Sequence, residues 1–180
     1  MTRRRSVSFS VAILLSLAAC AVPLESIYAP ADTTGWKVAH AQDVRGAGNI
    51  VERIPVNETL QNWTKMVTVQ FFENERQTPQ TMMDRLRARM LQRCPGAIWN
   101  QLESDRTSVL YEWRIASCPG EQDQHELSRL LQGNDGLHRI AYTEKVANLP
   151  ANVRARWIDT LKGAYVVKGG RENRVIVSSN

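Results

Sequence analysis

The sequence predicts an α+β domain in which an antiparallel β-sheet packs against two or three helices. Apolar and polar residues alternate in several short segments, as they do in strands with one buried face. A loop rich in Gly, Asn and Asp separates two of these segments, which is typical of a β-hairpin. Helical segments do not alternate regularly with strands, so a parallel sheet with crossover helices is not expected.

The first three strands are expected in the N-terminal half of the chain. Residues 35–39 can begin the first strand, and the Gly-Ala-Gly-Asn segment at 46–49 predicts a turn. Residues 50–56 alternate and predict the second strand, with Pro55 at its end or at a sheet edge. Residues 67–72 are mostly β-branched or aromatic and predict the third strand.

Two helices are expected in the same half of the chain. Asn57 can cap a short helix that reaches Trp63. Thr78 and Pro79 predict the start of a longer helix ending at Arg93, because Thr is a good cap and Pro is favoured at the first helical position. Its apolar residues recur every fourth position and predict a buried stripe of Met82, Leu86 and Met90.

The C-terminal half predicts four more strands. Residues 98–102 form the first of them, and residues 107–117 form a second with one apolar and one mostly polar face. Residues 125–132 and 137–146 predict a hairpin, because the loop at 133–136 holds residues that tolerate positive φ.

A last helix is expected to start at Pro150 and to end near Gly163. Its buried face is expected to hold Val153, Trp157 and Leu161.

The chain is expected to hold one folded domain, over residues 35–168. Residues 1–19 are expected to be a signal peptide. Residues 20–34 contain two prolines and no periodic pattern, so we expect a flexible tether there. Residues 169–180 are expected to be a loose tail, in which Val175–Val177 can add a short edge strand.

The first twenty residues predict export from the cytosol. Arg3, Arg4 and Arg5 form a positive start, and residues 6–19 form an uncharged, mostly apolar run, as in a secretory signal peptide. The run is shorter than the about 20 apolar residues that span a bilayer. Its last residues and the next, Leu17-Ala18-Ala19-Cys20, resemble the lipobox of bacterial lipoprotein precursors.

The lipobox resemblance implies that Cys20 becomes the acylated N-terminus of the mature protein, with fatty chains such as palmitate anchoring it to a membrane. Because Ala21 stands where an Asp would favour inner-membrane retention, the resemblance implies an outer-membrane lipoprotein that faces the periplasm. Cleavage by an ordinary signal peptidase is the alternative and would release a soluble secreted protein.

Cys94 and Cys118 are expected to form a disulfide, because the periplasm is oxidising and each begins a Cys-Pro-Gly segment next to a turn. A metal site or a redox pair is the alternative. The sequence offers no matching His pair and no Cys-x-x-Cys motif, so the structural disulfide is favoured.

Several segments are similar to those of the PsbP-like domains of secreted and periplasmic proteins. They are the opening strand at Gly35-Trp36, a short helix near Asn62-Trp63 leading into Val67–Gln70, a central helix, a late hairpin, and a closing helix around Trp157. The resemblance covers residues 35–167. It implies a sandwich of sheet and helices and a non-enzymatic assembly or accessory role.

No catalytic residues, metal site or cofactor are predicted. The histidines lack metal-binding spacing and are expected on the surface or in cross-strand packing: His40, His125 and His138. The sequence has no Gly-x-Ser-x-Gly elbow and no phosphate loop before a helix. Two carboxylate pairs are spaced as in any chain of this composition: Glu103 with Asp105, and Glu112 with Glu126.

Three arginines recur every fourth residue on the long helix: Arg85, Arg89 and Arg93. Because guanidinium groups bind carboxylates and phosphates well, this arginine stripe can contact lipid headgroups, lipopolysaccharide or an acidic envelope protein. The alternative is a solvated helix face. The net charge of +5 falls to about +2 without the signal peptide, so nucleic-acid binding is not expected.

Together these features favour a non-enzymatic outer-membrane lipoprotein that acts as an accessory or assembly factor by binding another envelope component. A carrier or sensor of a small apolar ligand is the alternative, which a cavity lined by Met and Trp would support. Trp63, Trp113 and Trp157 are expected in the core, whereas Trp36 or Trp99 can line a groove. A hydrolase is a third hypothesis and needs a His and a carboxylate in one cleft.

Overall fold

The computed structural model describes residues 25–168 of the chain. In chain order they form β1 (Glu25–Tyr28), β2 (Trp36–Val44), β3 (Gly48–Pro55), β4 (Lys65–Glu73), α1 (Pro79–Arg93), β5 (Ile98–Ser104), β6 (Ser108–Ile115), β7 (Gln124–Gln132), β8 (Gly136–Glu144), α2 (Ala151–Lys162) and β9 (Tyr165–Lys168).

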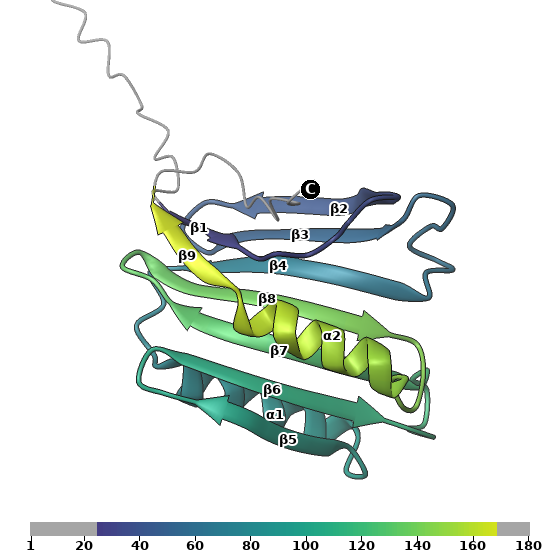
Figure 1. The fold of residues 1–180 in the computed structure, drawn as a ribbon. Coiled ribbons are helices and arrows are strands. Elements are labelled where there is room, and N and C mark those ends of the chain that lie inside the picture. The colour runs from purple at the N-terminus through teal and green to yellow at the C-terminus, as the bar shows by residue number, and fades with distance from the viewer. Residues whose placement is uncertain (1–24, 169–180) are drawn as a thin grey trace, which may run out of the picture.

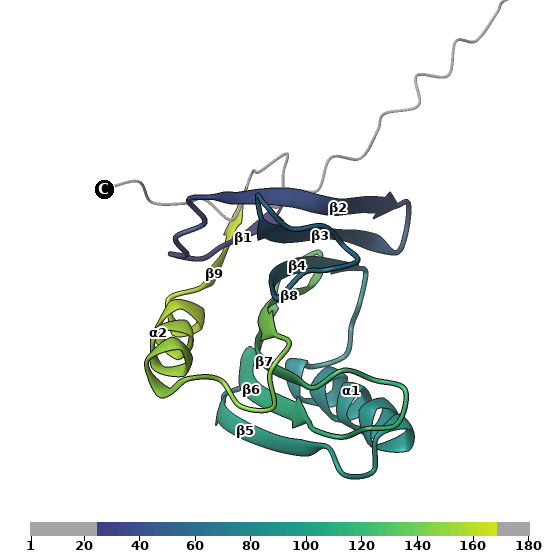
Figure 2. The ribbon, with the colours of Figure 1, turned by 90° about the vertical axis from the view of Figure 1, so that its right-hand side faces the viewer.

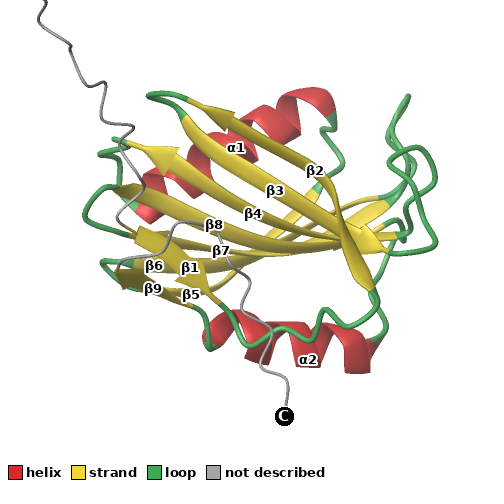
Figure 3. Ribbon diagram, turned by 90° about the horizontal axis from the view of Figure 1, so that it is seen from above, coloured by secondary structure: helices red, strands yellow, loops and turns green. Residues whose placement is uncertain are grey.

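The strands form a seven-stranded antiparallel sheet in the order β2-β3-β4-β8-β7-β6-β5, and β1 pairs with β9 in a separate antiparallel ribbon (Figure 1). Helix α1 covers one face of the sheet, and α2 covers the other face together with the ribbon (Figure 2 and Figure 3). The predicted α+β class and antiparallel sheet are confirmed. The described residues are richer in strand than expected and hold two helices.

Helix α1 begins and ends where the sequence predicts. The side chain of Thr78 accepts a hydrogen bond from the Thr81 N–H at 3.1 Å, and Pro79 is the first helical residue. Met82 and Met83 are buried against the sheet, while Leu86 and Met90 are half-buried beside them. The predicted stripe therefore faces the sheet, but its C-terminal part is more open.

The hairpin of β7 and β8 is confirmed, with Gln132 paired to Leu137 and the Gly133 N–H bonded to the Gly136 carbonyl at 2.8 Å. Strand β6 differs from the prediction of one mostly polar face. Because α2 and the ribbon cover that side of the sheet, Leu110 and Glu112 are buried as well.

The closing helix starts after Pro150 and is followed by Gly163, as predicted, and it buries Trp157 and Leu161. Gly163 has an ordinary φ of −76°, so it is not needed for a left-handed turn. Glycine suits this position because the backbone passes close to Pro30: a Cβ there would lie 3.0 Å from Pro30 Cγ.

The predicted short helix after Asn57 is wrong, and these residues form turns. The Glu58 carboxylate accepts hydrogen bonds from the Thr64 backbone N–H and side chain, and Asn62 Oδ1 accepts one from the Thr59 N–H at 2.6 Å. These local bonds satisfy backbone donors that a helix would otherwise use.

The flexible tether predicted over residues 20–34 is wrong for residues 25–34, which belong to the folded body. Strand β1 pairs with β9 from Glu25 opposite Lys168 to Tyr28 opposite Tyr165. Ile27 is fully buried in the core on the α2 side. The expected domain boundary at residue 35 therefore lies too late in the chain. Cys20 and the expected tail at 169–180 lie outside the described residues.

Candidate binding groove between helix α1 and the sheet

A groove of about 440 Å³ opens between α1 and the sheet. Five of its lining residues come from α1, and the others project from β5, β6, β7 and β8. They are Leu86, Arg89, Met90, Gln92, Arg93, Trp99, Tyr111, Trp113, Glu126 and Arg139. The groove is thus bounded by the half-buried, C-terminal part of the predicted apolar stripe, Leu86 and Met90.

Aromatic rings from β5 and β6 form one wall of the groove. Trp99 stands opposite Trp113 in the strand register. Its ring lies 5.0 Å from that of Tyr111 at 12° and 6.5 Å from that of Trp113 at 15°. Tyr111 and Trp113 are buried, whereas Trp99, on the edge strand, is half-buried. The prediction that Trp36 or Trp99 can line a groove is confirmed for Trp99; Trp36 packs against the other core.

A buried ion pair forms the polar end of the wall. Arg139 on β8 donates to Glu126 Oε1 on β7 at 2.6 Å. The same carboxylate accepts hydrogen bonds from Trp113 Nε1 at 2.9 Å, from Ser128 Oγ at 2.5 Å and from Thr143 Oγ1 at 3.1 Å. Burial alone would lower the pKa of Arg139, but the Glu126 charge more than offsets it and holds that pKa above its ordinary value. The Arg139 guanidinium is therefore charged and paired with Glu126.

The opposite wall carries two arginines, Arg89 and Arg93. Arg93 has an exposed ion pair with Glu121 at 3.7 Å, and Arg89 has no ion pair within residues 25–168. Arg85 pairs instead with Glu75 at 3.6 Å and does not line the groove. The structure thus brings two of the three residues of the predicted arginine stripe to the groove.

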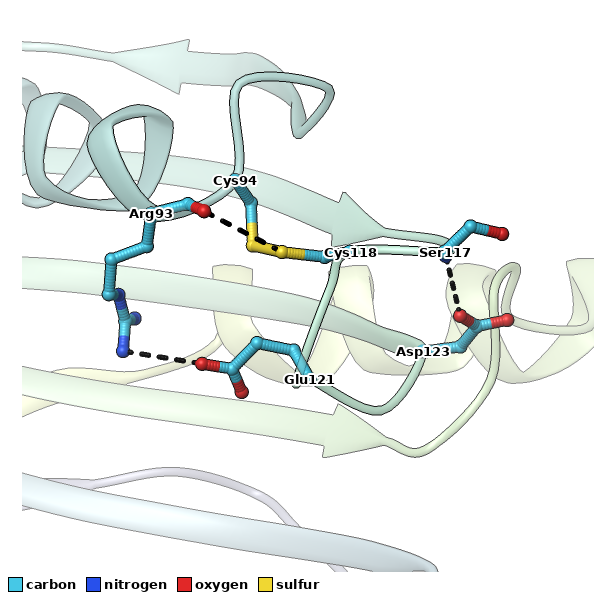
Figure 4. Close-up of a disulfide and its surroundings, with 6 residues drawn as sticks. All are labelled: Arg93, Cys94, Ser117, Cys118, Glu121 and Asp123. Atoms are coloured by element: carbon cyan, nitrogen blue, oxygen red, sulfur yellow. Dashed lines mark hydrogen bonds and ion pairs between the residues drawn. A yellow bond between two sulfur atoms is a disulfide. The ribbon is translucent and has the colours of Figure 1, made fainter.

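The predicted disulfide between Cys94 and Cys118 is present, with the two Cα atoms 5.7 Å apart (Figure 4). It ties the C-terminal end of α1 to the loop after β6. That loop also carries Glu121, the partner of Arg93 (Figure 4). The disulfide therefore fixes the end of the helix that presents Arg93 to the groove.

The histidines lie away from the groove. His125 and His138 sit at opposite ends of the paired strands β7 and β8, and both are buried, so the surface role expected for them is wrong while cross-strand packing holds. His40 lies on the edge strand β2 and is half-buried.

Each buried histidine has its own carboxylate. His125 Nδ1 accepts from the Leu149 N–H at 2.9 Å, and its Nε2 lies 3.3 Å from Glu112. His138 stacks on Phe71 and lies 3.6 Å from Glu25. Burial lowers the pKa of both histidines below the ordinary value.

The carboxylate pairs considered in the sequence do not converge. Glu112 faces the α2 side of the sheet, where Arg154 donates to it at 2.7 and 3.1 Å, whereas Glu126 faces the α1 side. Glu103 pairs with Lys162. Asp105 accepts hydrogen bonds in its own turn, above all from the Thr107 N–H, which lowers its pKa to about 2.

Within the described part of the chain, no group of three or more His, Cys, Asp or Glu side chains is arranged to hold a metal ion. None of the helices in residues 25–168 is long and apolar enough to cross a membrane. No protein-family model and no curated protein sequence matches the chain.

Proposed function

We propose that this protein is a carrier or sensor that binds a small, mostly apolar molecule in the groove between α1 and the sheet. The observation that carries the proposal is the lining of that groove. Trp, Tyr, Leu and Met side chains supply five of its ten lining residues, and the other five are four charged side chains and Gln92. Small-molecule sites are of this kind, with volumes of about 300 to 1,000 Å³.

The groove favours this function over an accessory role that depends only on a flat partner surface. An aromatic row that is open on one side leaves apolar area in water, and a ligand that covers it gains about 25 cal/mol per Å². The two buried histidines lie outside the groove, where His125 accepts a hydrogen bond from the Leu149 N–H and His138 lies 3.6 Å from Glu25, so the geometry gives less support to a hydrolase.

We propose further that Cys20 is acylated and that the domain faces the periplasm from the outer membrane. The signal-peptide pattern and the lipobox resemblance of residues 17–20 support this proposal. The Cys94–Cys118 disulfide adds support, because such bonds persist in oxidising compartments. Membership of the PsbP-like sandwich group also remains a proposal, supported by the antiparallel sheet with one helix on each face.

Binding can be tested with the full-length chain carrying Cys20→Ser, which removes the acylation site. Ten-carbon amphiphiles with neutral, anionic and cationic heads are titrated by calorimetry and by tryptophan fluorescence. We expect saturable binding of at least one of them with a stoichiometry of one. Trp99→Leu should weaken that binding, whereas Trp63→Leu, which lies outside the groove, should not. The proposal fails if no probe binds or if both variants behave like the parent protein.

A further inference from the structure

We infer that the groove selects an amphipathic anion, a molecule with an apolar body and one carboxylate or phosphate head. This inference rests on the proposed function and names the class of ligand. The observation behind it is the distribution of charge around the apolar side chains that line the groove.

Three arginines and one carboxylate line the groove. The carboxylate, Glu126, is already held at both oxygens by four donors, so it has little capacity left for a cationic ligand. Its charge also neutralises Arg139. What remains is the charge of Arg89, which has no ion pair among the described residues, and that of Arg93. The net field in the groove is therefore positive and favours an anion.

Arg89 and Arg93 lie one turn apart on the same side of α1, so their guanidinium groups can approach one anionic head together. Guanidinium forks match carboxylate and phosphate oxygens, and charge-assisted hydrogen bonds are the stronger class. The only acid that competes for these two groups in the described structure is Glu121, which meets Arg93 at 3.7 Å with both side chains exposed. A ligand head can displace so weak a pair.

The apolar body of the ligand would lie along Trp99, Trp113, Leu86 and Met90. At about 30 Å³ for each non-hydrogen atom, the share of one water molecule in the liquid, the groove holds roughly 15 such atoms. A chain of ten carbons with a small head group fits this volume. It also leaves the head near the end of α1, which the disulfide fixes.

The experiment compares decanoate and decyl phosphate with decan-1-ol and decylammonium, all titrated into the full-length Cys20→Ser chain. We expect at least one of the anions to bind about tenfold more tightly than the alcohol, and decylammonium to bind most weakly. A preference for decanoate would indicate a fatty-acid-like ligand, and a preference for decyl phosphate would indicate a phospholipid-like one; either result supports the inference.

Charge variants locate the head group. Arg89→Gln and Arg93→Gln should each weaken anion binding about tenfold and leave decan-1-ol unchanged. Arg87→Gln is the matched control, because Arg87 is exposed on the same helix and does not line the groove. Glu121→Gln should strengthen anion binding by about two- to fivefold, since it frees Arg93.

Two results separate failure of the inference from failure of the proposed function. If decan-1-ol binds as tightly as the anions and depends on Trp99, the groove binds ligands but does not select anions. Selection of anions by the groove is equally refuted if Arg87→Gln weakens decanoate binding as much as Arg89→Gln does. If none of the four probes binds, the proposed function itself is refuted.

Discussion

Arg139→Met tests whether the buried pair behind the groove holds the sheet together. The variant keeps an unbranched apolar side chain of similar length and removes one charged hydrogen bond of 2.6 Å to Glu126. Glu126 is then left as a buried carboxylate without its counter-charge, only 6% exposed. Removing one partner of a buried ion pair costs about 3–5 kcal/mol.

We expect the lower end of that range, about 3 kcal/mol, because three neutral donors continue to bind the carboxylate. In a domain of this size, such a loss lowers Tm by roughly 6–12 °C, at about 2–4 °C per kcal/mol. Urea denaturation followed by tryptophan fluorescence gives the free energy of unfolding directly. Arg87→Met, at an exposed position on α1, is the control and should change stability by less than about 0.5 kcal/mol.

The double variant Glu126→Gln, Arg139→Met identifies the mechanism. The amide oxygen of a Gln side chain can still accept hydrogen bonds from Trp113 and Ser128, and its NH₂ group can donate to the Thr143 hydroxyl, yet it leaves no buried charge. We therefore expect the double variant to be more stable than Arg139→Met alone. A loss below about 1 kcal/mol in the single variant, or a double variant that is less stable still, would refute the reasoning about an unpaired buried charge.

Three further predictions follow from the disulfide, the buried histidine and the N-terminus. Cys94→Ser with Cys118→Ser should reduce the free energy of unfolding by about 3.5 kcal/mol, the chain-entropy value for a loop of this length, and a loss near zero in urea denaturation would contradict it. Burial lowers the pKa of His138 in the folded state, so its contribution to stability is complete above its ordinary pKa of 6.5 and is lost as the pH falls through the lower folded value. The decline in unfolding free energy between pH 7.5 and pH 5 should thus be smaller in His138→Gln, and an unchanged decline would argue against this assignment. Radiolabelled palmitate should enter the chain in bacterial cells and be absent from Cys20→Ala; equal labelling of the two would rule out acylation at this residue.

The sequence predicts most elements of the main sheet because their signals are local. Thr78 and Pro79 mark the start of α1, and the loop at 133–136 marks the hairpin, without reference to any distant residue. Strand β1 has no such signal. Its Glu25 looks like a solvated residue, but it is buried because the Asn134 and Asp135 N–H groups bind its carboxylate, and these lie 109 and 110 residues away in the chain.

The groove could be predicted only in part. Trp99 stands out because no apolar stripe accounts for it, and the arginine spacing on α1 is visible in the sequence. No local sequence signal indicates that Glu126 and Arg139 form an ion pair, since their pairing depends on the register of β7 against β8. Strand alternation places Glu126 beside Trp113 once β6 and β7 are aligned, and that alignment is the missing information. Likewise, only tertiary structure shows that Glu75 draws Arg85 away from Arg89.

The pairing of β1 with β9 brings the first and the last strand of the folded body side by side. Glu25 stands opposite Lys168, and antiparallel partners lie about 4.5–5.5 Å apart at Cα, so a linker of a few residues could join them. New termini could then be opened at the exposed turn around residue 46, between β2 and β3. A circularly permuted chain of this kind would keep every strand pair in place, and it would show that the starting point of the polypeptide is incidental to the architecture.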